Sequence, residues 1–172
     1  FIESDIGKKK SLILSERLRK INPTAKIEPL DLRIEDKNII KIFKNFKMII
    51  DCSDNFKTRY LINKVCFRKK KILISAALQN FDVQAFAISA WEKSDHPCYE
   101  CIFPKTNENF PNQNCREAGI IGPVTGLIAS LQVSEAIREC IIKKNANKNN
   151  FFLNNSNAGK LILYDATLQE IN

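Results

Sequence analysis

The sequence predicts an α/β fold in which helices cover both faces of an open, mainly parallel sheet. Expected helices and strands alternate along most of the chain, as they do in proteins built from strand–helix–strand units. Met48, Ile49 and Ile50 run directly into a polar stretch, which is typical of a buried strand that ends in a turn. With 172 residues, 44% hydrophobic and 27% charged, the chain is long enough to bury one core.

Periodicity and turn residues define each expected element. Apolar residues at helical spacing predict helices over residues 8–21, 36–43, 56–68 and 123–142. Short apolar runs predict strands over residues 26–30, 48–50, 71–77, 83–90 and 160–164. A polar loop with three Pro is expected over residues 91–114, and an Asn- and Lys-rich flexible insertion over residues 143–159.

The net charge of +8 is interpreted as a solvated surface, because Lys residues are spread along the chain and do not interleave with aromatic residues. We therefore expect no nucleic-acid partner. No apolar run approaches the roughly 20 residues that span a bilayer, and no signal peptide opens the chain, so we expect no membrane partner and a cytoplasmic location. The start on Phe1 indicates a partial chain.

Six Cys without a secretory signal favour thiols or metal ligands over disulfides. Three lie in apolar periodic segments and are expected in the core: Cys52, Cys66 and Cys140. Cys98 and Cys101 form a C-x-x-C motif in a loop, which is either half of a tetrahedral zinc site or a redox pair. Cys115 precedes Arg116, so it is a candidate nucleophile, a further metal ligand or an inert thiol.

The polar turn over residues 51–55 is the expected ligand site, because ligands of open α/β sheets lie outside the carboxyl ends of the strands. Asp51 and Asp54 together can hold a metal ion or a ribose. Alternatively, Asp54 or Asn55 only caps the helix that follows. Lys10, in a run of three Lys before a helix, either neutralises a phosphate or belongs to a solvated basic turn.

Several motifs, in this order, resemble the ThiF/MoeB/HesA family, the prokaryotic relatives of ubiquitin-activating enzymes. The motifs lie at residues 5–10, 21–23, 51–55, 58–59, 62–63, 98–101, 115–119, 122–123, 130–137 and 164–165. The resemblance implies a single Rossmann-like adenylation domain over residues 1–172, incomplete at the N-terminus. The family's glycine-rich nucleotide loop is expected before Phe1 and its second C-x-x-C after Asn172. The Pro that usually precedes the phosphate-binding Lys is Lys9 here.

The resemblance also implies an adenylyltransferase that uses ATP and Mg²⁺ on the C-terminal glycine of a small ubiquitin-like sulfur carrier ending in Gly-Gly. Lys10, Asp54 and Asn55 match the cofactor-binding positions, and Asp54 with Arg59 the catalytic ones. Cys115 matches a loop cysteine that can join covalently to the carrier.

Cys98 and Cys101 match half of a structural zinc site in the family. Expected partners are the carrier, a second copy in a homodimer, and a sulfurtransferase or cysteine desulfurase. The motifs around Cys101 and Cys115 favour the thiamine-pathway, ThiS-like carrier. A molybdopterin-pathway adenylyltransferase and a truncated, non-catalytic docking module are the alternatives.

Overall fold

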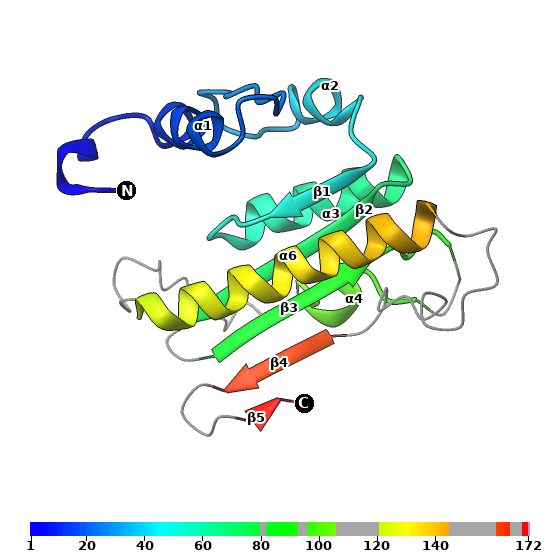
Figure 1. Cartoon of the computed structure of the whole chain (residues 1–172). Helices are drawn as coiled ribbons and strands as arrows, with labels where there is room; N and C mark the ends of the chain where they lie inside the picture. The colour runs from blue at the N-terminus through cyan, green and yellow to red at the C-terminus, as the bar shows by residue number, and fades with distance from the viewer. Residues whose placement is uncertain (80–81, 93–95, 106–120, 145–160, 166–169, 172) are drawn as a thin grey trace. The chain divides into compact units, whose positions relative to one another are not determined.

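The computed structural model describes residues 1–79, 82–92, 96–105, 121–144, 161–165 and 170–171 (Figure 1). The chain divides into two compact units, Phe1–Ile34 and Glu35–Asn172. The single domain expected over residues 1–172 stays a prediction. Most of the insertion expected over residues 143–159 lies outside the described residues, although the helix before it continues to Lys144.

The first unit contains two helices, η1 (Glu3–Asp5) and α1 (Lys10–Ile21). Arg17 of α1 donates a hydrogen bond to the Asp5 carboxylate and so ties the helices together. α1 confirms the predicted first helix. The strand predicted over residues 26–30 is wrong, because this segment has no regular secondary structure. A strand needs a neighbour to pair its backbone groups, and residues 1–34 contain none.

The second unit is built on a sheet of five described strands in the order β1-β2-β3-β4-β5. They are β1 (Met48–Asp51), β2 (Ile72–Gln79), β3 (Asp82–Ile88), β4 (Leu161–Asp165) and β5 (Glu170–Ile171). Only β1 and β2 pair in parallel among these strands, so the described sheet is mixed rather than mainly parallel. Two residues separate β2 from β3, whereas parallel neighbours need a crossover of about a dozen residues.

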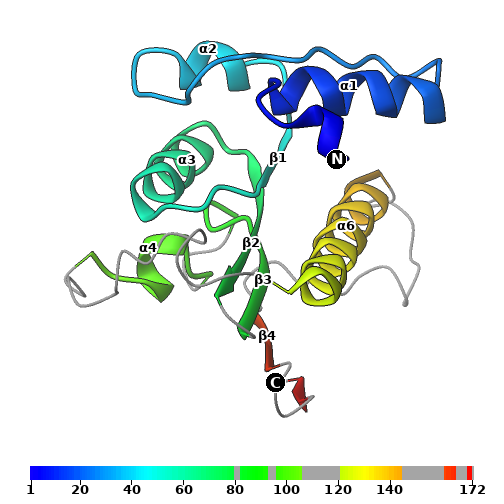
Figure 2. The same cartoon turned by 90° about the vertical axis from the view of Figure 1, so that its left-hand side faces the viewer.

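Helices cover both faces of this sheet, as the sequence predicts (Figure 2). α3 (Phe56–Arg68) and α4 (Tyr99–Ile102) lie on one face, and α6 (Gly122–Lys144) lies on the other. α2 (Ile39–Phe43) precedes β1 and is shorter than predicted. Within the part of the chain that the structure describes, no helix has both the length and the apolarity needed to cross a bilayer.

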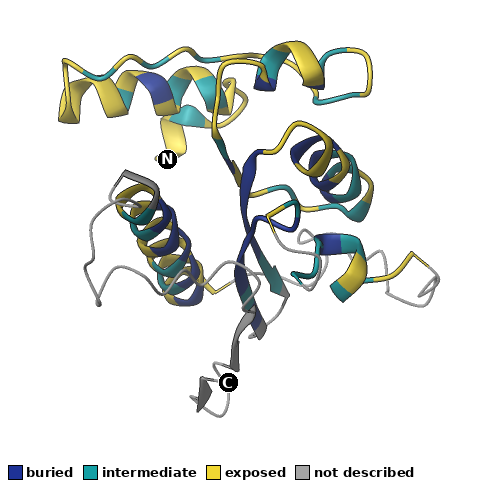
Figure 3. Ribbon diagram, turned by 90° about the vertical axis from the view of Figure 1, so that its right-hand side faces the viewer, coloured by how far each residue is buried: buried dark blue, intermediate teal, exposed yellow. Residues whose placement is uncertain are grey.

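α6 packs closely against the sheet because the strands present small side chains to it. Ala85 and Ala87 of β3 are fully buried there. Ala85 packs in a cluster with Val124 and Ile128, and Ala87 packs in a second cluster with Ala136. The helix therefore has a buried face towards the strands and an exposed outer face (Figure 3).

The opposite face of the sheet carries an aromatic cluster. The ring of Phe86 on β3 lies 5.7 Å from that of Tyr99 on α4, and Tyr99 lies 5.6 Å from Tyr60 on α3 in an edge-to-face arrangement. Phe86 alternates with Ala85 and Ala87 along the strand, so it points away from α6. This cluster anchors the short helix that begins next to Cys98.

Candidate functional site

The turn after β1 is held by the side chain of Asp51, which is 3% exposed. One carboxylate oxygen accepts a hydrogen bond from the Ser53 backbone N–H at 2.9 Å, and the other accepts one from Ser75 Oγ at 3.4 Å. Asp51 therefore closes the turn from inside and connects it to β2. The two carboxylates that the sequence groups together have different surroundings, because Asp54 is exposed.

Asn55, not Asp54, caps α3. Its side-chain oxygen accepts a hydrogen bond from the Thr58 backbone N–H at 2.9 Å, which satisfies one of the free donors at the helix start. Its amide nitrogen donates to Asp54 Oδ1 at 3.2 Å. The capping alternative thus applies to Asn55, and Asp54 presents an exposed carboxylate beside the amino end of α3.

Arg59 is buried beneath the same turn, with 7% of its surface exposed. Its guanidinium donates hydrogen bonds to the Ser53 carbonyl and, at 3.5 Å, to Ser75 Oγ. Ser75 in turn donates to Asp51, so these side chains form one network below the turn. The described hydrogen bonds of Arg59 stabilise the turn from the face of the sheet that α3 covers. Its catalytic role stays a prediction.

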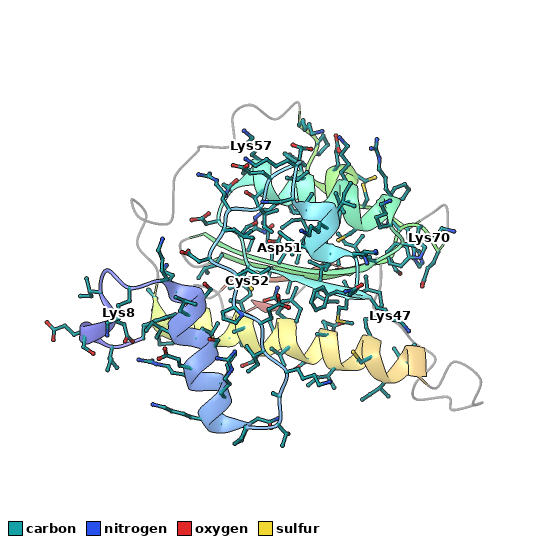
Figure 4. The ribbon with its side chains drawn as sticks, turned by 90° about the horizontal axis from the view of Figure 1, so that it is seen from above. Lys8, Lys47, Asp51, Cys52, Lys57 and Lys70 are labelled. Atoms are coloured by element: carbon teal, nitrogen blue, oxygen red, sulfur yellow. The ribbon has the colours of Figure 1, made fainter. Side chains whose placement is uncertain are left out.

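Gln132 of α6 completes the support of the turn from the other face of the sheet. Its amide nitrogen donates to the carbonyls of Asp51, at 2.9 Å, and Ile74, at 3.2 Å. Its oxygen accepts a hydrogen bond from Cys52 Sγ at 3.3 Å. In Figure 4 Asp51 and Cys52 lie next to each other at the end of β1. Partial desolvation at the end of β1, together with the Asp51 charge, raises the pKa of the Cys52 thiol and keeps its proton available.

The sequence prediction assigned no site role to Gln132. Two signals were available: Gln132 lies within the family motif at residues 130–137, and it is a polar residue in phase with the apolar Ile128 and Ala136 of a long helix. The core prediction is confirmed for Cys66, which is 2% exposed, and wrong for Cys52 and Cys140, which are exposed. Cys52 lies beyond the last residue of β1, and Cys140 lies on the outer face of α6.

Cys98 and Cys101 face each other at one end of α4, with their sulfur atoms 3.2 Å apart. Asn63, buried on α3, accepts a hydrogen bond from the Tyr99 backbone N–H at 3.0 Å and so fixes the start of α4. Burial raises the pKa of the Cys98 thiol, but hydrogen bonds from Cys101, Asn63 and the backbone outweigh that effect and lower it. A lowered thiol pKa favours the thiolate that binds metals.

A second contact fastens the segment after α4 to α3. The Tyr60 hydroxyl donates to the Phe103 carbonyl at 2.9 Å. The Lys105 ammonium lies 5.2 Å from the centre of the Tyr60 ring and forms an ion pair with Glu100 at 2.8 Å. The two thiols are therefore presented by a short helix that is held at both of its ends.

Two thiols on one side fit two positions of a tetrahedral zinc site, since Zn–S bonds of about 2.3 Å bring ligand sulfurs into contact. No group of three His, Cys, Asp or Glu that could hold a metal ion occurs among the described residues. Cys115 lies outside the described residues. Asp54 offers one exposed carboxylate, and Mg²⁺ is commonly bound through one or two carboxylates together with phosphate oxygens and water.

Lys10 is the first residue of α1 and is exposed, and its neighbour Lys9 forms an ion pair with Asp31 at 3.2 Å. Lys10 belongs to the first unit and Asp54 to the second. A pocket of about 90 Å³, lined by residues that include Ile39 of α2 and Leu61 of α3, contains no residue of the turn.

Three curated relatives of the chain are named as adenylyltransferases. The chain is 31% identical over 168 residues to the sulfur carrier protein adenylyltransferase of Thermus thermophilus, which covers 96% of the chain and 58% of that protein. It is 34% identical over 139 residues to the sulfur carrier protein ThiS adenylyltransferase of Escherichia coli, covering 80% of the chain and 53% of the relative. It is also 34% identical over 136 residues to the adenylyltransferase and sulfurtransferase MOCS3 of Xenopus laevis, covering 79% of the chain and 30% of the relative.

The fold has a counterpart among solved structures. Escherichia coli MccB crystallised with ATP superposes with a TM-score of 0.72 at 20% identity, covering the whole chain and 49% of MccB. The chain spans about half the length of MccB and of the first two of these relatives. The ThiF family matches residues 1–169. A match over nearly the entire length, together with these relatives, shows that the chain belongs to the ThiF family.

Proposed function

We propose that this chain forms part of an ATP-dependent adenylyltransferase that activates the C-terminal glycine of a small ubiquitin-like sulfur-carrier protein. The observation that carries the proposal is the ThiF-family match over residues 1–169. Three of the relatives are named as sulfur-carrier adenylyltransferases or as adenylyltransferases with sulfurtransferase activity. The exposed carboxylate of Asp54, at the carboxyl end of β1, supplies a chemical group suited to this reaction.

In the proposed reaction the carrier's terminal carboxylate attacks the α-phosphorus of ATP. A bond forms between a carboxylate oxygen and this phosphorus, the bond from the phosphorus to the oxygen bridging to the β-phosphate breaks, and pyrophosphate leaves. The nucleophile is already ionised, so no general base is needed. Because both reactants are negative, the site must position them and neutralise charge.

Each site residue then has a proposed role. Asp54 binds Mg²⁺, which neutralises phosphate charge when it is bound. Lys10 contacts the phosphates, and Asn55 holds Asp54 while it caps α3. Arg59 is proposed to act through its hold on the Ser53 carbonyl beneath the turn.

The cysteines serve two further proposed roles. Cys98 and Cys101 contribute two of the four ligands of a structural zinc ion, and the contact between their sulfur atoms supports this. Cys115 joins covalently to the carrier in two balanced steps: its thiolate takes the outer sulfur of a persulfide on the proposed sulfurtransferase or desulfurase partner, whose own thiolate leaves, and the resulting Cys115 persulfide attacks the carrier's acyl-adenylate, so that an acyl disulfide forms and AMP leaves. A carrier-linked species that disappears on reduction and is absent from Cys115→Ser would support the covalent role, and unchanged sulfur transfer by that variant would refute it.

We propose a ThiS-like carrier in thiamine thiazole synthesis, on the basis of the relative named for ThiS. A molybdopterin-pathway carrier is the alternative, because a probable molybdopterin-synthase adenylyltransferase of Porphyra purpurea is also 34% identical, over 136 residues. A homodimer, a sulfurtransferase or cysteine desulfurase partner, and a cytoplasmic location are proposals that follow the family.

Pyrophosphate exchange tests the proposal. The protein at its natural length, mixed with ATP, Mg²⁺ and a carrier ending in Gly-Gly, should incorporate labelled pyrophosphate into ATP. Asp54→Ala should reduce this exchange by about a hundredfold, the scale on which loss of one electrostatic group affects charged transition states. Asp36→Ala is the matched control, since Asp36 is also exposed, belongs to the same unit as Asp54 and lies outside the turn. Undiminished exchange in Asp54→Ala would remove Asp54 from the mechanism.

A further inference from the structure

We propose that Gln132 is a positioning residue for the adenylation site: its buried amide ties α6 to the end of β1 and to the part of β2 that pairs with it, and thereby sets the position of the turn that carries Asp54. This inference rests on the proposed function for its catalytic consequence. The tie itself rests on the geometry of the second unit.

Every polar atom of the Gln132 side chain has a partner. The amide nitrogen has two hydrogens, and both of its contacts are backbone carbonyls, of Asp51 at 2.9 Å and of Ile74 at 3.2 Å. The amide oxygen accepts from Cys52 Sγ at 3.3 Å. Only 4% of Gln132 is exposed, so these bonds are shielded from water.

The two carbonyls belong to neighbouring parallel strands. Asp51 pairs with Ser75 in the ladder, and Ile74 lies one residue before Ser75. One side chain of α6 therefore holds the end of β1, from which the turn emerges, and the residues of β2 that pair with it. Cys52, the next residue along the chain, is held by the same side chain, so β1 and the start of the turn share one anchor.

The opposite face of the sheet has its own anchor, formed by Arg59 and Ser75, which hold the Ser53 carbonyl and the Asp51 carboxylate. Side chains of two helices, α3 on one face of the sheet and α6 on the other, therefore form hydrogen bonds to the turn. Asp54 itself is exposed, and its carboxylate accepts a hydrogen bond from the neighbouring Asn55 side chain. The position of its carboxylate consequently depends on how firmly residues 51–53 are held.

The test replaces Gln132 by Met, which is similar in length and unbranched but can neither donate to the carbonyls nor accept strongly from the thiol. Gln132→Glu is the second variant, because it retains the acceptor for Cys52 and loses the donor to Asp51 and Ile74. Ile128→Val is the matched control: it lies one helical turn earlier on the same buried face, and it contacts the sheet through apolar groups alone.

Amide hydrogen exchange provides a readout that does not depend on activity. In the protein at its natural length, Gln132→Met and Gln132→Glu should accelerate exchange in peptides covering residues 48–55 and 72–77 by about tenfold or more. Ile128→Val should leave residues 48–55 unchanged. Pyrophosphate exchange at saturating ATP should fall at least tenfold in both Gln132 variants and stay at the wild-type rate in Ile128→Val.

The outcomes separate this inference from the proposed function. Unchanged hydrogen exchange over residues 48–55 in both Gln132 variants would overturn the tie. Faster hydrogen exchange with a wild-type rate of pyrophosphate exchange would overturn the positioning role. If the wild-type protein exchanges no pyrophosphate with any carrier, the proposed function fails, and the tie is then decided by hydrogen exchange alone.

Discussion

Adjacent polar residues in the turn after β1 perform different tasks because their burial differs. Asp51 is almost fully buried and its carboxylate is occupied by hydrogen bonds from Ser53 and Ser75. Asp54, three residues later, is exposed, and Asn55 between it and α3 takes the capping position. A pair of carboxylates that resembles a shared metal site in the sequence is therefore one structural and one available carboxylate.

The buried thiol of Cys66 should make the free energy of unfolding depend on pH in the alkaline range. Burial raises the pKa of its thiol from the ordinary value of 9.0 to about 12. The folded protein then holds a proton that the unfolded chain releases, so stability is fully present below pH 9.0 and falls as the pH rises towards 12. In this window the wild-type free energy of unfolding should fall more steeply than that of Cys66→Ala, by about 1.4 kcal/mol per pH unit.

Urea unfolding at several pH values checks this expectation. Cys140→Ala is the control, because Cys140 is exposed and its removal should leave the slope at the wild-type value. Parallel pH profiles for wild type and Cys66→Ala would mean that the Cys66 thiol titrates in the folded protein as it does in the unfolded chain.

At the scale of elements, α3 connects the two candidate sites. Its amino end is capped by Asn55 beside Asp54, and its buried middle carries Arg59 towards the turn and Asn63 towards α4. A single helix of 13 residues thus supports the exposed carboxylate at one point and the pair of thiols at another. Its placement follows from the apolar residues Ile62, Val65 and Cys66, which are buried.

The cap of α3 should have a measurable energy. Asn55→Ala removes the acceptor for the Thr58 N–H and should lower the free energy of unfolding by about 1 kcal/mol. Asn55→Asp keeps an oxygen acceptor and adds a negative charge at the helix amino end, so its stability should remain near the wild-type value. Denaturant titration measures both, and equal stability of Asn55→Ala and wild type would argue against the cap.

For the whole molecule, two proposals predict different responses to ligands. An adenylyltransferase should bind ATP with Mg²⁺, and at a hundredfold excess over Kd this adds about 2.7 kcal/mol to stability. Thermal denaturation of the protein at its natural length should show the increase, and Asp54→Ala should lose most of it. A non-catalytic docking module should instead be stabilised by the carrier alone, with no shift on addition of ATP.

Much of the fold was predictable because local patterns are strong where one face of an element is buried. α1, α3 and α6, together with the strand that ends in Asp51, follow directly from apolar spacing. The hairpin of β2 and β3 was not predicted, because the sheet was expected to be mainly parallel; the short connection between the two strands excludes parallel pairing. The prediction over residues 26–30 failed because a strand depends on a partner that residues 1–34 do not provide.

The sequence by itself determined the α/β class, the ThiF-family motifs and the position of the turn that carries Asp54, because these depend on the order and spacing of neighbouring residues. Tertiary structure alone decided which polar side chains are buried in hydrogen bonds and which stay exposed to a ligand. Asp51, Arg59 and Gln132 are separated by up to 81 residues, and only packing of α3 and α6 on opposite faces brings their polar atoms to one end of β1. These three side chains are buried and form hydrogen bonds with the turn, whereas Asp54 is exposed at the surface of the turn.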